Sequence, residues 1–188
     1  ISGETALTSA PAATDEFLVS DAGTLKRIDY SLISPKFESA LLHVRDEKSA
    51  GTDGGSASSS TDAARVLNTI VTNEISGASL SSNQITLPAG TYFIQASAPA
   101  YASGKNRISL YNTSDSSLTL LGQSNGYVRS SNAHGVNTDL VGRFTIAAEK
   151  VFELRHFTTD AQSGSGLGVS ENNSRTEYFT SVQIWKVA

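Results

Sequence analysis

Alternation of apolar and polar residues, which is typical of half-buried strands, dominates the chain from residue 41 onward. Short runs rich in β-branched and aromatic residues are separated by turn sequences such as Pro-Ala-Gly and Asn-Thr-Ser-Asp. The predicted strands are 41–44, 65–71, 84–87, 91–98, 107–111, 118–121, 139–147, 151–157 and 178–187. Because no amphipathic helical period runs through this region, the sequence predicts an all-β sandwich over residues 41–188.

A separate pair of short strands is predicted near the start of the chain, at residues 17–20 and 24–30. Between them, Asp21-Ala22-Gly23 suits a three-residue turn, since Gly tolerates the left-handed conformation that ends such turns. A two-stranded hairpin is barely stable alone in water. Residues 1–40 are therefore expected to form an attachment segment that needs a neighbour.

The stretches around this hairpin are expected to be arm and linker. Residues 1–14 are small and polar without a period, which favours an extended arm. Ser34-Pro35 is a fair helix start, so a short turn of helix is expected at 35–40. The chain begins at Ile1 rather than Met, so a piece of a longer protein is the simpler expectation.

Two Gly-rich segments are predicted to be connections. Residues 49–62, SAGTDGGSASSSTD, are expected to be a flexible loop whose apolar content is too low to pack. GSGLG at 164–168 lies between predicted strands without a following helix or Lys, which argues against a phosphate loop. Its glycines are expected to permit tight backbone paths.

The last predicted strand is apolar on both faces. Strict alternation places Tyr178, Val182 and Ile184 on one face. Phe179 and Trp185 then share the opposite face, where a one-sided sandwich strand should be polar. Another subunit of a symmetric oligomer would cover that face, with Phe179 or Trp185 near the contact. Cover by loops of the same chain is the alternative.

Composition narrows the class of protein. The 188 residues carry a net charge of −4 and no basic stripe, which argues against a nucleic-acid partner. There is no Cys, so disulfides and thiolate metal sites are excluded. No run of 18 apolar residues occurs, so no membrane insertion is expected.

The sequence offers little catalytic chemistry. His43 and His156 fall in predicted strands and are expected to be structural, and His134 lies in a loop. No His-x-x-x-His, Glu-x-x-His or Asp-x-Asp-x-Asp spacing and no Gly-x-Ser-x-Gly elbow are present. We therefore predict neither a cofactor nor an enzymatic activity. A carboxylate pair that meets in space and cleaves glycans is the alternative.

Two predicted loops combine aromatic rings with amide or charged groups, which suits a sugar or protein receptor. The candidate receptor-binding residues are Tyr127, Arg129, Asn132 and His134 in SNGYVRSSNAHGVN (124–137), with Tyr101 and Lys105 in APAYASGKN (98–106). Loops carry function disproportionately. A loop that merely caps the sandwich is the alternative.

The stretch 65–101 resembles the first half of the jelly roll of the C1q and tumour-necrosis-factor-like superfamily. That family has an I-x-L-P-x-G-x-Y step into a long strand, matched by Ile85, Leu87, Pro88, Gly90 and Tyr92. RISLYN, LVGRFTIAA, VFELRHF and EYFTSVQIWKV are similar to the strands that follow, in order. The resemblance covers about residues 41–188 and implies a homotrimer around a threefold axis.

The segment DEFLVSDAGTLKRIDYSLI (15–33) resembles a short repeat of bacteriophage fibre proteins. This likeness implies a trimeric structural protein located in a phage virion, as a tail or head fibre. Residues 1–40 would contact other virion proteins, and the jelly roll would face a host surface glycan or protein. Capsid decoration, a neck or tail plug, a glycan-cleaving fibre head and a secreted bacterial C1q-like module are the alternatives.

Overall fold

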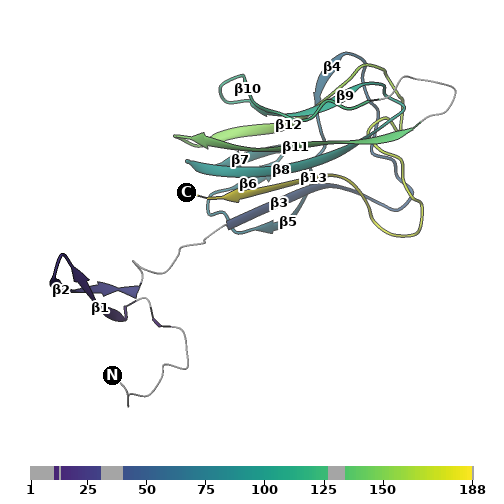
Figure 1. Ribbon diagram of the computed structural model, residues 1–188. Coiled ribbons are helices and arrows are strands. Elements are labelled where there is room, and N and C mark those ends of the chain that lie inside the picture. The colour runs from purple at the N-terminus through teal and green to yellow at the C-terminus, as the bar shows by residue number, and fades with distance from the viewer. Residues whose placement is uncertain (1–10, 13, 31–39, 127–133, 188) are drawn as a thin grey trace. The chain divides into compact units, whose positions relative to one another are not determined.

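The computed structural model describes residues 11–12, 14–30, 40–126 and 134–187. The chain divides into two compact units, Ile1–Phe37 and Glu38–Ala188, and each is considered by itself (Figure 1). Most of the predicted arm at 1–14 and of the predicted helical turn at 35–40 lies outside the described residues.

The first unit contains the predicted hairpin. Strands β1 (Glu16–Asp21) and β2 (Thr24–Asp29) pair antiparallel up to Asp21 and Thr24. The turn therefore has two residues, Ala22 and Gly23 with φ of 48° and 84°, and not the predicted three. Leu18 and Leu25 share one face of the ribbon and are both 74% exposed. The hairpin therefore has apolar surface that its own two strands do not cover.

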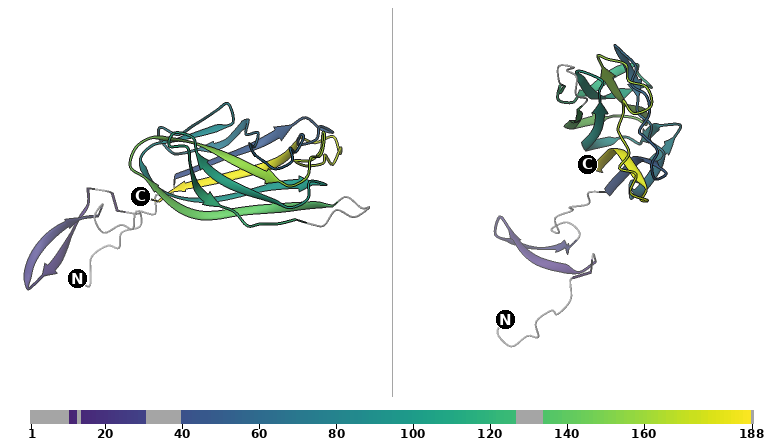
Figure 2. Two further views of the ribbon diagram at one scale, coloured as in Figure 1. Left: turned by 90° about the horizontal axis from the view of Figure 1, so that it is seen from above. Right: turned by 90° about the vertical axis from the view of Figure 1, so that its right-hand side faces the viewer.

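The second unit is a sandwich of two five-stranded antiparallel sheets that lie face to face (Figures 1 and 2). The β8 sheet has the order β11 (Gly135–Ile146), β8 (Gly90–Tyr101), β13 (Glu177–Lys186), β3 (Ala40–Lys48) and β5 (Thr69–Asn73). The β9 sheet has the order β10 (Ser117–Leu121), β9 (Asn106–Asn112), β12 (Lys150–Thr158), β7 (Gln84–Leu87) and β6 (Ser79–Ser81). The predicted all-β sandwich is thereby confirmed.

The core lies between the two sheets and is built by the alternation seen in the sequence. The fully buried residues are Leu42, Val44, Ile85, Leu87, Tyr92, Ile94, Ile108, Leu110, Phe152, Leu154, Val182 and Ile184. Phe144 links the sheets, with its ring centroid 5.5 Å from that of Tyr92 and 5.4 Å from that of Phe152. Burial of this apolar set is the main favourable term in folding.

The predicted strand 65–71 is wrong. The chain instead forms β4 (Thr61–Ala64), which runs beside β12 of one sheet, and then β5, which pairs with β3 of the other. Between them the amide of Asn68 takes the place of a backbone ladder, since it exchanges two 2.8 Å hydrogen bonds with the backbone of Glu47. A segment that changes sheets cannot be one continuous strand.

The prediction that residues 49–62 do not pack is also wrong. Gly54, Gly55 and Ala57 donate backbone hydrogen bonds of 2.9–3.0 Å to the segment between β12 and β13. A Cβ on Gly54 would lie 2.5 Å from the carbonyl oxygen of Leu167, so the two backbones approach more closely than side chains allow. Backbone contact replaces the missing apolar side chains.

The faces of β13 differ from strict alternation at its start. One extra residue lies in the strand between Tyr178 and Ser181, which pair with Glu47 and Arg45 respectively. Tyr178 is consequently 60% exposed, and the prediction that it shares the face of Val182 and Ile184 is wrong.

Candidate functional site on the outer face of the β8 sheet

The outer face of the β8 sheet is the surface that points away from the core. Its cross-strand rows run from Phe93 and Trp185 at one end, through Gln95 and Gln183, to Pro99 and Tyr101 at the other. Central strands of a half-exposed sheet normally present polar residues outward. The two ends of this face depart from that rule in different ways.

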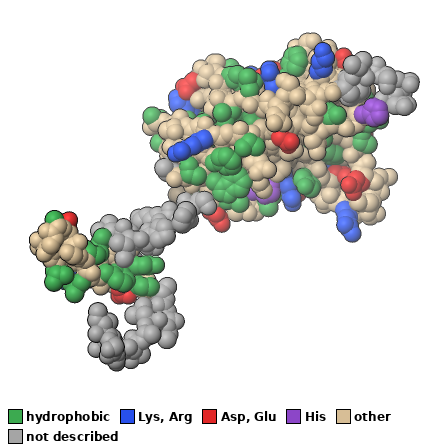
Figure 3. Space-filling view, in the orientation of Figure 1, with side chains coloured by type: hydrophobic (Ala, Val, Ile, Leu, Met, Phe, Trp, Pro, Cys, Tyr) green, Lys and Arg blue, Asp and Glu red, His purple; other side chains and the backbone are tan. Residues whose placement is uncertain are grey.

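The first end is an exposed aromatic cluster, which we call the aromatic end: Leu41, Phe93, Val141 and Trp185. The rings of Phe93 and Trp185 lie 5.9 Å apart between centroids, and Trp185 pairs with Leu41 on its other side. Phe93 is 38% and Val141 59% exposed. Figure 3 shows hydrophobic side chains gathered beside the C-terminal end of the chain. This region is an apolar patch without cover from the described chain, and the charged Arg143, which pairs with Phe93 in the ladder, lies at its edge.

The middle of the face is polar and has charged side chains at its sides, since Asp139 pairs with Ser97 in the ladder and Arg45 forms an ion pair with Glu47. His43 Nε2 lies 3.0 Å from Ser181 Oγ, and Gln183 sits between Gln95 and His43 in the ladder. Burial lowers the pKa of His43, and nearby Arg45 adds to this effect. The neutral imidazole is therefore the favoured form here.

The second end is a groove, which we call the loop-end groove. It consists of two adjoining hollows of about 450 and 320 Å³ that share Pro99, Asn137, Gly168 and Val169 as walls. Its floor is the outer face of β8, β11 and β13, and its wall is the wall loop, residues 159–176. Tyr178 lines the first hollow and Tyr101 the second.

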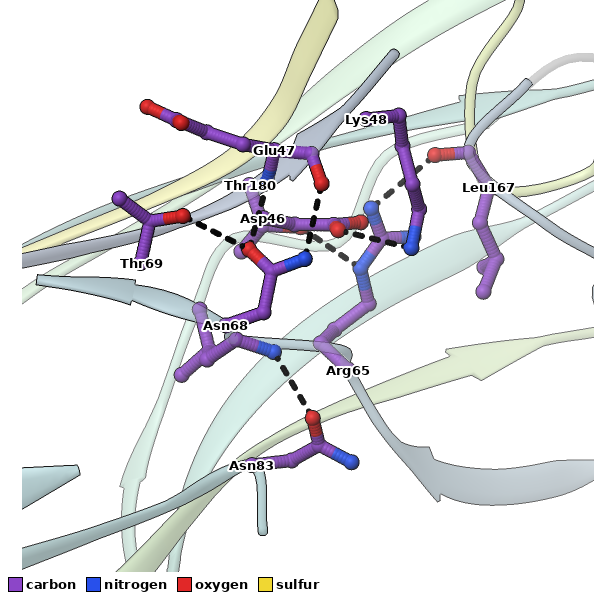
Figure 4. A network of polar contacts seen from close by, with 10 residues as sticks. Asp46, Glu47, Lys48, Arg65, Asn68, Thr69, Asn83, Leu167 and Thr180 are labelled. Carbon is purple, nitrogen blue, oxygen red and sulfur yellow. Dashed lines mark hydrogen bonds and ion pairs between the residues drawn. The ribbon is translucent and has the colours of Figure 1, made fainter. Parts of the chain in front are cut away.

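A buried arginine fixes the base of the wall loop. Arg65 donates a 3.0 Å hydrogen bond to the carbonyl of Leu167 and a 2.8 Å bond to Thr180 Oγ1 (Figure 4). Burial lowers the pKa of Arg65 to about 10, although the carboxylate of Asp46 partly opposes this. Asp46 is itself fully buried and forms a 3.0 Å ion pair with Lys48. The guanidinium stays charged at neutral pH and ties the loop to both sheets.

Two carboxylates hold the remainder of the wall loop. Glu177 accepts backbone N–H bonds from Gly51, Glu171 and Asn172 at 3.0–3.2 Å. These bonds, that from Glu171 foremost, lower the pKa of Glu177. Asp53 accepts bonds from the backbone N–H and the hydroxyl of Ser170, which lower its pKa as well. The wall is thus positioned before any ligand arrives.

Phe179 completes the wall rather than the aromatic end. A Cβ on Gly168 would lie 2.2 Å from Phe179 Cδ1, so the ring packs directly on the backbone of that glycine. The expectation that glycines of GSGLG permit tight backbone paths is confirmed here and at Gly166, whose Cβ would meet Ala57.

The structure separates the predicted receptor-binding residues. Tyr101 lines the loop-end groove. The backbone N–H of Ala102, which follows Tyr101 in the chain, donates a 3.2 Å hydrogen bond to the carbonyl of His134. Lys105 instead lines a pocket on the β9 sheet side with Arg107 and Phe157, which shares no lining residue with the groove. The remaining candidates, Tyr127, Arg129 and Asn132, lie outside the described residues.

The predicted structural role of His156 is confirmed. Its Nε2 lies 3.2 Å from Asn106 Oδ1 in the core, and burial, with a contribution from Arg65, lowers its pKa to about 3. Within the described ranges, no group of three or more His, Asp or Glu side chains is placed to hold a metal ion. Nor does that part of the chain include a helix both long and apolar enough to cross a membrane.

The opposite surface, the outer face of the β9 sheet, differs in character. There Glu153 accepts hydrogen bonds from Gln84 at 3.0 Å and Arg155 at 2.9 Å. Arg155 also lies 3.5 Å from the ring centroid of Tyr111. Charged side chains that pair with one another in this way are typical of a solvated face.

Comparison with known proteins identifies the fold. No protein-family model matches the chain, and no curated protein matches its sequence. Among solved structures, it is similar to the Eiger TNF of S. frugiperda, with 12% identity, 80% of this chain and 93% of that chain covered, and a TM-score of 0.53.

Two further solved structures cover similar shares of the chain. The globular domain of zebrafish complement 1qA has 9% identity, covers 79% of this chain and 98% of its own length, and has a TM-score of 0.49. Murine APRIL has 11% identity, covers 80% and 100%, and has a TM-score of 0.48.

The sandwich therefore has the TNF-like jelly-roll fold, which the sequence resemblance implied. At 12% identity this likeness describes the fold and assigns no residue a role.

Proposed function

We propose that this chain is a homotrimeric, non-enzymatic structural protein of a phage virion, built as a tail or head fibre. The jelly roll is displayed outward and binds the host surface. Residues 1–40 attach it to other virion proteins. The aromatic end of the outer face of the β8 sheet turns toward the neighbouring copies.

The observation that carries the trimer is the contrast between the two outer faces. The β8 sheet presents the ring pair of Phe93 and Trp185 on two central strands, whereas on the β9 sheet the exposed Leu118 lies on an edge strand and the central strands present paired charges such as Glu153 and Arg155. Exposed apolar patches of this kind mark interaction surfaces. Proteins that self-associate most often do so with closed symmetry, and three copies of this fold would cover the patch around an axis.

The polar rows beside the patch support the same arrangement. Gln95 and Gln183 can donate and accept hydrogen bonds to their own copies without burying a net charge. Contact at this polar row therefore buries no charge, whereas Arg143 beside Phe93 has to stay at the rim of the contact.

The virion assignment rests on the first unit. Its hairpin has the sequence that resembles phage fibre repeats and leaves Leu18 and Leu25 exposed. Attachment to another virion protein would remove these side chains from water, with a gain of about 25 cal/mol per Å² of apolar surface.

The assignment is tested by immunogold labelling of phage particles from the source culture, with an antibody raised against residues 40–188. Label at fibre tips is expected. Label spread over the capsid would indicate a decoration protein instead, and particles without label would contradict the virion assignment. An antibody against an unrelated jelly roll is the control for non-specific labelling.

A further inference from the structure

We propose that the loop-end groove is a binding site for a neutral oligosaccharide. This inference deepens the proposed function, because it rests on the jelly roll facing a host surface and names the ligand class and the residues that contact it. Tyr178 and Tyr101 supply the rings, and Asn137 supplies an amide between them.

The first argument is the way in which the wall is held. A loop of mainly polar residues gains little from apolar burial. Its backbone is instead held by one hydrogen bond from Arg65, one to Asp53 and two to Glu177. Buried charge is a costly means of stabilising a fold. It is well suited to preorganising a site, since a ligand then meets a groove that needs no ordering.

The second argument is the chemistry of the lining. The ring of Tyr178 is 60% exposed, although the Arg45 guanidinium lies 5.2 Å from its centroid, and Ser97, Ser181 and Asn137 offer hydroxyl and amide groups nearby. A sugar ring has apolar faces that stack on aromatic groups and hydroxyls at its rim that require donors and acceptors. A sugar-binding site therefore needs aromatic side chains together with a few polar groups at fixed positions.

The third argument is charge. Among the described residues that line the two hollows, Arg175 is the one cation, and it is accompanied by Glu171 and Glu177. A phosphate or sulfate ligand would meet more negative than positive groups, because Arg45 beside Tyr178 is already paired with Glu47. A lipid tail would need an enclosed apolar cavity, whereas this groove is open and partly polar. A neutral, polyhydroxylated ligand is the class that remains.

The site is weak on its own and gains strength from copy number. A shallow groove with a few hydrogen bonds gives modest affinity, but three grooves on one trimer would engage a repetitive surface glycan together. Repetition of the ligand along a polysaccharide matches repetition of the site around the axis.

The test uses saturation-transfer NMR on the full chain with four neutral hexasaccharides: maltohexaose, cellohexaose, mannohexaose and N-acetylchitohexaose. We expect a signal from at least one of them. Tyr178→Ser and Asn137→Ala should each weaken it about fivefold, the effect of losing one stacking or hydrogen-bonding contact. Tyr111→Ser, which removes an aromatic ring from the β9 sheet, should leave it unchanged.

The contrary results are equally specific. No signal from any neutral hexasaccharide would overturn the inference, and so would binding that survives Tyr178→Ser. Groove-dependent binding of a heparin hexasaccharide or of a peptide alone would overturn it too. Light scattering on every variant keeps the two proposals distinct: a trimer that binds no sugar refutes only the groove, whereas a monomeric wild type refutes the trimer.

Discussion

At the scale of single residues, buried charged side chains hold together more of the fold than the sequence suggests. Arg65 follows a polar stretch, and nothing in its neighbours marks it as buried, because its partners Thr180 and Leu167 lie more than 100 residues away. His156, by contrast, could be predicted as a core residue from alternation alone. Polar residues whose partners are distant in sequence are those that a pattern cannot place.

Replacing Arg65 by Met should destabilise the jelly roll by about 3 kcal/mol, because Thr180, Leu167 and Asp46 lose their cationic partner inside the protein. Urea denaturation measures the free energy of unfolding. Adding Asp46→Asn should recover part of the loss. Arg175→Met is the matched control, since Arg175 is exposed and should cost no more than about 0.5 kcal/mol. Equal losses for the two single variants would contradict this role.

Stability should fall as the pH drops below about 6.5, through His156. Its pKa is about 3 in the folded protein, so between these values the unfolded chain binds more protons than the folded one. The free energy of unfolding falls by at most about 1.4 kcal/mol per pH unit. The full stability is present above the pKa that the histidine has in the unfolded chain. Denaturation at pH 7 and pH 5 measures it.

A comparison of variants isolates this effect, because His43 also has a lowered pKa and changes stability in the same direction. His156→Gln should show a smaller pH dependence than the wild type. His134→Gln, at an exposed position, controls for loss of a histidine at the surface. An unchanged pH dependence in His156→Gln would show that His156 titrates normally in the fold.

At the scale of elements, most strands of the core were predictable, whereas their connections and the strand expected at 65–71 were not. Alternation placed β7, β8, β9 and β12 within a few residues, because each buries one face against the other sheet. The packing of residues 49–62 against the wall loop was missed, since backbone-to-backbone contact leaves no apolar signal. The groove depends on this contact and on the extra residue in β13, so the sequence located Tyr101 but not its neighbours.

Gly168→Ala should damage the groove directly. The new Cβ would fall 2.2 Å from the Phe179 ring, at a φ of 136° that side chains disfavour, so a loss of about 2 kcal/mol is expected. Hydrogen exchange should show faster opening of the wall loop. Gly135→Ala is the matched control, because its Cβ would meet nothing within 4 Å. Equal protection of the loop in both variants would exclude this packing role for Gly168.

At the scale of the whole molecule, the two outer faces of the sandwich have divided roles. The β9 sheet faces solvent with paired charges, while the β8 sheet combines the aromatic end, which is proposed for contact between copies, with the groove, which is proposed for the ligand. Apolar residues on both faces of β13 indicated such a contact from the sequence. The symmetry of the contact came from the family resemblance alone, since one chain does not encode an axis in its strand pattern.

Replacing both Phe93 and Trp185 by Gln should dissociate the assembly while the jelly roll stays folded, since both side chains point away from the core. Sedimentation velocity of the full chain should then show mainly monomer at micromolar concentration, and circular dichroism should retain the β spectrum. Tyr111→Gln on the β9 sheet should leave the assembly intact. Persistence of the assembly in the double variant would place the contact elsewhere.

The trimer is tested most directly by light scattering of the purified 188-residue chain at micromolar concentration. The arrangement proposed for the β8 sheet predicts a particle with three times the 19.7 kDa mass of the chain, unchanged on tenfold dilution. A stable particle of 19.7 kDa would contradict it.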